Sequence, residues 1–78
     1  MKIEQAPLNQ FAVCLNNEGY AASLEVGKIY RVIDDKEAIE MGLIRIIDES
    51  GEDYAFSASR FYPISVPKPV EDVLIAAR

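Results

Sequence analysis

The sequence predicts a small, mainly β domain, in which five short strands form a closed or nearly closed barrel. Three observations lead to this fold. The chain has 78 residues, which is room for one domain. Apolar residues alternate with smaller or polar ones over short runs, which is the period of a β-strand. A long early loop and a late tight hairpin separate these runs, as in small barrels.

The chain divides into three parts. Residues 1–9 show no sustained periodicity, and we expect an N-terminal segment that is mobile or lies at a sheet edge. Residues 10–65 contain all the strand patterns and form the barrel domain. Residues 66–78 begin with the semi-rigid spacer Val-Pro-Lys-Pro and continue into a short C-terminal helix.

Two strand patterns occupy the first half of the domain. Phe11, Val13 and Leu15 alternate with smaller or polar neighbours, which predicts a strand. A long irregular loop follows and runs to Gly27. The next run, residues 28–33, is rich in β-branched and aromatic residues and predicts the second strand.

A short helical insertion is predicted at about residues 35–41. Asp34 can act as its N-cap, and Glu37 stands at the right spacing to complete a capping box. Gly42 lies where a left-handed residue ends a helix. A helix of two turns or fewer is stable only when it packs against the domain.

Three strands follow the insertion. The most apolar run, residues 43–48, predicts a strand that is covered on both faces or whose outer face meets a partner. Gly51 suits the positive φ of a tight turn, so residues 53–57 return as the partner strand. After a short turn of 3₁₀ helix, residues 61–64 form a closing edge strand, because their proline cannot donate to a sheet hydrogen bond.

Parts of this pattern resemble Src-homology-3-like small barrels. Ser23–Val32 is similar to their passage from loop to strand, and Tyr54–Phe61 is similar to their last strands and the 3₁₀ turn between them. The combination of residues 19–20, 27–30 and 44–54 also resembles a set of small uncharacterised bacterial proteins. The resemblance covers nearly the whole barrel domain. It implies a five-stranded Src-homology-3-like barrel and implies no activity.

Peptide-binding members of that class hold a polyproline helix in a groove of aromatic side chains. The matching positions here hold Cys14, Asn16, Ser57 and Arg60, so the aromatic walls are missing. We therefore expect no polyproline ligand.

Composition narrows the chemistry further. Eight basic and thirteen acidic residues give a net charge of −5, which argues against general nucleic-acid binding because the phosphate backbone would be repelled. The chain has no histidine, and Cys14 is its only cysteine, placed in an apolar run that favours burial over reactivity. We therefore expect no enzyme, no metal site and no cofactor.

The acidic hairpin is interpreted as a solvated turn. Its carboxylates do not have the spacing of a twelve-residue calcium loop. They are Asp48, Glu49, Glu52 and Asp53. The chain shows neither a secretory signal nor an apolar run of the ~20 residues that a membrane span needs, so we expect a cytoplasmic protein.

The remaining hypothesis is a protein-interaction or regulatory module that binds another protein or a second copy of itself. Tyr20 follows a glycine in a polar loop and is the aromatic residue most expected at the surface. The C-terminal residues lie at helical spacing and form an apolar stripe that either caps the barrel or docks elsewhere. The candidate contact residues are Tyr20, Leu43, Arg45, Ile47, Tyr54, Val70, Val73 and Leu74.

An alternative function rests on three arginines. Arg31, Arg45 and Arg60 would form a local basic patch for nucleic acid or another anion if they shared one face. Arg45 also has a simpler interpretation, because it could form a cross-strand ion pair with Asp53, placed diagonally across the hairpin.

Overall fold

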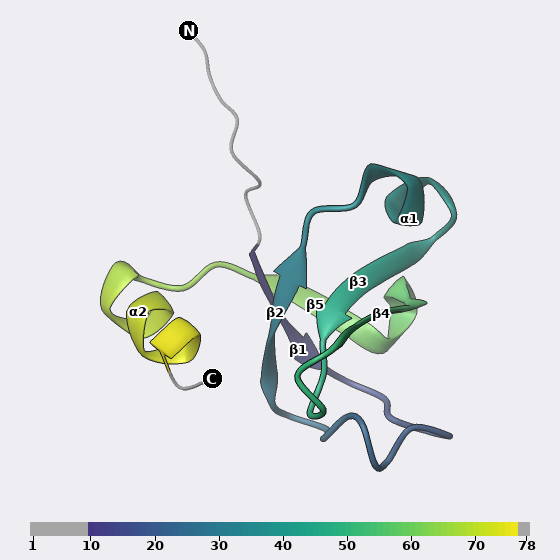
Figure 1. Ribbon diagram of the computed structural model, residues 1–78, viewed down its shortest axis with the longest axis horizontal. Coiled ribbons are helices and arrows are strands. Elements are labelled where there is room, and N and C mark those ends of the chain that lie inside the picture. The colour runs from purple at the N-terminus through teal and green to yellow at the C-terminus, as the bar shows by residue number, and fades with distance from the viewer. Residues whose placement is uncertain (1–9, 77–78) are drawn as a thin grey trace, which may run out of the picture.

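Five strands form one antiparallel sheet in the computed structural model, which describes residues 10–76 (Figure 1). Their order across the sheet is β4-β3-β2-β1-β5. The strands are β1 (Phe11–Cys14), β2 (Ile29–Ile33), β3 (Leu43–Ile47), β4 (Asp53–Ser57) and β5 (Phe61–Ile64). The helices are α1 (Lys36–Glu40), the 3₁₀ turn η1 (Ala58–Arg60) and α2 (Lys68–Ala76). The mainly β prediction is confirmed. The predicted N-terminal segment and the last two residues of the predicted C-terminal helix lie outside the described residues.

The sheet bends about β2. Residues 29–31 of this strand pair with β1, and Val32 and Ile33 pair with β3. The bend brings the two edge strands together through their side chains, because the rings of Phe56 on β4 and Phe61 on β5 lie 5.9 Å apart. No backbone pairing joins β4 to β5 in the described part of the chain, so hydrogen bonds do not close the sheet into a barrel.

The core lies on the concave side of this bend. Its buried members come from all five strands and from the long loop: Ala12, Cys14, Leu24, Tyr30, Ile46, Phe56 and Phe61. The predicted burial of Cys14 is confirmed. The predicted first strand is one residue too long, since Leu15 follows the end of β1 and is 54% exposed. The small residues of β1 face the core because the three rings fill it.

The start of α1 differs from the prediction by one residue. The N-cap is Asp35, and not Asp34, because the Asp35 carboxylate accepts a hydrogen bond from the Ala38 backbone N–H at 3.1 Å. The same carboxylate binds Arg45, so tertiary contact selects the capping residue. Gly42 ends the helix with a φ of 77°, as predicted.

The hairpin and the closing strand agree with the sequence analysis. The strand β4, the turn η1 and the strand β5 occupy the predicted residues, and Gly51 has the expected positive φ of 86°. The predicted strand over residues 43–48 ends at Ile47.

The C-terminal helix α2 lies to one side of the sheet (Figure 1). It begins two residues earlier than the apolar stripe indicated, because a proline at its second position is compatible with the first helical turn. No residue of α2 is buried. No helix in the described part of the chain is long and apolar enough to cross a membrane.

Candidate functional site

Two exposed tyrosines flank one buried phenylalanine. Tyr20 is 44% exposed and its ring meets Phe56 edge to face, with centroids 5.2 Å apart. Tyr54 is 56% exposed and its ring centroid lies 6.3 Å from that of Phe56. The guanidinium of Arg60 stacks over Tyr20 at 4.8 Å from the ring centroid. We call these four residues the aromatic patch.

Arg60, the cation of the aromatic patch, is held in place by hydrogen bonds to the start of the long loop. The Arg60 side chain donates from Nη1 to the Asn16 carbonyl at 3.2 Å, and the Arg60 carbonyl accepts from the Leu15 N–H at 2.7 Å. These contacts join η1 to the start of the long loop. A guanidinium stacked on an aromatic ring loses less conformational freedom when it binds, because its plane is already fixed.

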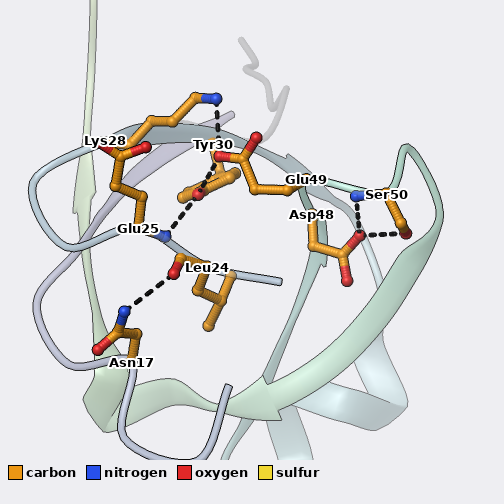
Figure 2. A network of polar contacts seen from close by, with 8 residues as sticks. All are labelled: Asn17, Leu24, Glu25, Lys28, Tyr30, Asp48, Glu49 and Ser50. Carbon is orange, nitrogen blue, oxygen red and sulfur yellow. Dashed lines mark hydrogen bonds and ion pairs between the residues drawn. The ribbon is translucent and has the colours of Figure 1, made fainter. Parts of the chain in front are cut away.

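The long loop that carries Tyr20 is fastened to the sheet at several points (Figure 2). Leu24 is buried in the core, and its carbonyl accepts a hydrogen bond from Asn17 Nδ2 at 2.9 Å. The Glu25 backbone N–H donates to the Tyr30 hydroxyl at 2.8 Å. The loop lacks regular secondary structure, yet side chains satisfy its backbone groups at these positions.

The acidic hairpin between β3 and β4 also holds the long loop in place, through contacts of Glu49. The Tyr30 hydroxyl donates to Glu49 Oε2 at 2.6 Å, and Lys28 Nζ lies 2.7 Å from the same oxygen (Figure 2). The Glu49 backbone N–H donates to the Ser23 carbonyl at 3.0 Å. Burial, followed by the hydrogen bond to Glu49, raises the pKa of Tyr30 above its ordinary value. The Tyr30 hydroxyl therefore stays protonated, and its two hydrogen bonds link the long loop to the hairpin.

The acidic turn is exposed to solvent at Glu49, Glu52 and Asp53, as predicted, but not at Asp48. Its side chain is fully buried. Oδ1 accepts from the Ser50 backbone N–H at 2.9 Å and from the Ser50 hydroxyl at 2.5 Å, which closes the hairpin turn. Oδ2 has no hydrogen-bond partner among the described residues. Within those residues, no group of three or more metal-ligating side chains is arranged to hold an ion.

The outer face of β3 is occupied by its own ion pairs. Leu43, Arg45 and Ile47 are all half-buried. Arg45 donates from Nε to Asp35 Oδ2 at 2.7 Å and from Nη1 to Asp53 Oδ2 at 3.1 Å, so the predicted diagonal pair is confirmed. The hydrogen bond from Arg45 holds the pKa of Asp35 below its usual range. The hydrogen bond to Asp35, in turn, raises the pKa of Arg45.

The three arginines of the alternative function have different surroundings. Arg31 is exposed on β2, Arg45 contacts two carboxylates, and Arg60 stacks on Tyr20. Arg45 is consequently a neutralised cation, and its charge contributes little to attracting an anion.

The apolar stripe of α2 remains largely open to solvent. Val70 is 41% exposed and Val73 is 65% exposed, whereas Leu74 is half-buried. An exposed ion pair between Lys68 and Asp72, with 2.7 Å between nitrogen and oxygen, spans the first turn of the helix. The helix therefore presents Val70 and Val73 as contact residues.

Of the predicted contact residues, the structure brings Tyr20 and Tyr54 into one surface. Phe56 and Arg60 join them on this surface, which the sequence pattern did not predict. One signal was present, because Tyr54 and Phe56 are two residues apart on a strand and must share a face. Comparison of the chain with family models, curated proteins and solved structures found no match.

Proposed function

We propose that this protein is a non-catalytic, cytoplasmic protein-interaction module, built on a Src-homology-3-like small barrel, that binds its partner through the aromatic patch. The observation that carries the proposal is the pair of exposed tyrosines on either side of Phe56, with Arg60 stacked on one of them. Tyrosine and arginine are the residue types, with tryptophan, that contribute most to binding at protein interfaces. A buried phenylalanine beneath them supplies a rigid floor.

Three features support the Src-homology-3-like description. The strand order places the last strand beside the first, and η1 links β4 to β5. The rings of Phe56 and Phe61 pack together across the interior, as the edge strands of a small barrel require. The long loop between β1 and β2 leaves the sheet and carries Tyr20 of the aromatic patch.

The fastening of the long loop supports a binding role. A loop that must be ordered on binding reduces affinity by the conformational entropy of its residues. Here Leu24, Tyr30 and Glu49 hold the loop before any partner arrives. Tyr20 can therefore meet a partner without that cost.

The groups that could act in chemistry are already engaged, which supports a non-catalytic role. Cys14 is 1% exposed in the core, where a thiol behaves as a small apolar side chain. The Tyr30 hydroxyl is 2.6 Å from Glu49 and buried. Neither group faces solvent where a substrate could reach it.

Site-specific photocrosslinking tests the proposal. A benzophenone amino acid placed at Tyr20 or Tyr54 in the full chain, expressed in the organism that carries it, should yield a discrete crosslinked protein. Tyr62 on β5 is the matched control, because it is 63% exposed and lies outside the aromatic patch. Equal crosslinking from position 62, or none from positions 20 and 54, would overturn the proposal.

The partner in this proposal is either another protein or a second copy of the chain. Light scattering of the purified protein separates the two, because a second copy doubles the mass at micromolar concentration. If the mass is doubled, the substitutions Tyr20→Ala and Val73→Ala show whether the aromatic patch or α2 makes the contact.

A further inference from the structure

A pocket of about 390 Å³ lies beside α1, away from the residues of the aromatic patch. It is bounded by the end of β2, the start of β3, the first residue of η1 and β5. Its volume falls within the range of pockets that bind small molecules. None of the four residues of the aromatic patch lines it, so the two surfaces can be tested separately.

The walls of the pocket are mostly apolar. Ile39 reaches it from α1 and is 64% exposed, so the wall is open to solvent at that point. An apolar body placed here would remove this surface and its own surface from water. The apolar lining residues are Val32, Ile33, Ile39, Leu43, Ile44, Ala58 and Pro63.

The charged groups of the lining gather at one side. Asp34 and Asp35 follow β2 directly, and Arg45 lies on the adjoining strand. Arg45 already donates to Asp35 and to Asp53, and Asp35 also caps α1. Asp34 is exposed, and its carboxylate makes no hydrogen bond or ion pair in the described part of the chain.

The sign of the local charge decides which ligand fits. The three charged lining side chains together carry one negative charge, and Asp34 is the one whose charge is not compensated. An anionic ligand would approach two carboxylates and would compete with Asp35 and Asp53 for Arg45. A cationic ligand would instead meet Asp34 without breaking an existing pair.

We propose that this pocket binds a small organic ammonium compound, with its apolar body between the aliphatic walls and its cation beside Asp34. The inference does not depend on the proposed function, because it concerns other residues and another class of ligand.

Three probes of similar size and different charge test the inference by amide-resolved NMR titration at pH 7. They are 2-phenylethylammonium, 2-phenylethanol and 3-phenylpropionate. Saturable shifts at Ile39, Leu43 and Ala58 are expected with the ammonium probe. The alcohol should bind about two- to five-fold more weakly, because it lacks the one exposed ion pair with Asp34. The carboxylate should bind more weakly still.

Matched variants locate the effect. Asp34→Asn should lower the affinity for the ammonium probe about two- to five-fold and leave that for the alcohol unchanged. Glu18→Gln, an equal charge change on the exposed loop, is the control and should alter neither. Ile39→Ala, at an exposed position, should weaken both ligands.

The inference would be wrong if none of the three probes gave saturable shifts at the pocket, or if the carboxylate bound as tightly as the ammonium. It would also fail if Glu18→Gln reduced ammonium binding as much as Asp34→Asn, because the attraction would then come from the overall charge.

Discussion

Removal of the Tyr30 hydroxyl tests how the long loop is held. The hydroxyl donates to the Glu49 carboxylate at 2.6 Å and accepts from the Glu25 N–H at 2.8 Å. A hydrogen bond to a charged group contributes ~1.5–3 kcal/mol, and a neutral one ~0.5–1.5 kcal/mol. Glu49 keeps its ion pair with Lys28, and its side chain is 33% exposed, so water can replace part of the loss. We therefore expect Tyr30→Phe to lower the free energy of unfolding by about 2 kcal/mol.

The measurement is urea unfolding followed by far-ultraviolet circular dichroism. A loss of about 2 kcal/mol corresponds to a fall in Tm on the order of 8–16 °C for a domain of this size. Tyr62→Phe is the control, because Tyr62 is 63% exposed, and it should change the stability by less than ~0.5 kcal/mol. If Tyr30→Phe changed the free energy of unfolding as little as Tyr62→Phe does, the Tyr30 hydroxyl would not stabilise the long loop as the geometry indicates.

The dependence of stability on pH tests the role of the Tyr30 hydroxyl independently. The pKa of Tyr30 is raised in the folded state, so folding favours the protonated phenol. The resulting stability is complete below the unfolded-state pKa of about 10 and is lost as pH rises above it. The wild-type protein should therefore lose stability more steeply above pH ~10 than Tyr30→Phe does. Parallel curves would contradict the assignment.

Three further outcomes are expected, each measured by urea unfolding. Asp48→Ala should cost about 1–3 kcal/mol because Ser50 loses its buried acceptor, whereas Asp48→Asn, which retains an oxygen, should cost less; equal losses would contradict the turn-closing role. Gly42→Ala should lower the free energy of unfolding by about 1 kcal/mol because its φ is 77°. Nothing lies within 4 Å of an added Cβ, so this cost comes from the backbone conformation alone, and an unchanged stability would mean that the backbone relaxes. Arg45 lowers the pKa of Asp35, so the stability from this pair exists above pH ~4 and is lost on acidification. Arg45→Gln should consequently lose less stability than wild type between pH 6 and pH 3, and an identical acid profile would refute this.

The strands were predictable because their signals are local. Alternation, the positive-φ position of Gly51 and the Pro63 edge position each act within a few residues, and they gave the residues of β4 and β5 correctly. The Arg45–Asp53 pair was predictable for the same reason, since the hairpin register follows from the turn.

Other features depend on contacts between distant segments. The choice of Asp35 over Asp34 as N-cap depends on Arg45, which lies on another element. The pocket takes its lining from α1 and from three strands and η1, so no local pattern contains it. The burial of Asp48 is an intermediate case. It continues the inward face of Ile44 and Ile46, a signal that its acidic neighbours obscured.

The polar contacts of the acidic hairpin hold the long loop in place, and the long loop carries part of the aromatic patch. In the hairpin, the Asp48 carboxylate closes the turn and the Glu49 carboxylate accepts a hydrogen bond from Tyr30, so two charges of this acidic chain stabilise the fold. Because Glu49 and Tyr30 fix the long loop, Tyr20 is held on Phe56 beside Tyr54. The polar network is therefore the reason that an irregular loop can present a defined surface, and loss of the Tyr30 hydroxyl should weaken partner binding as well as stability.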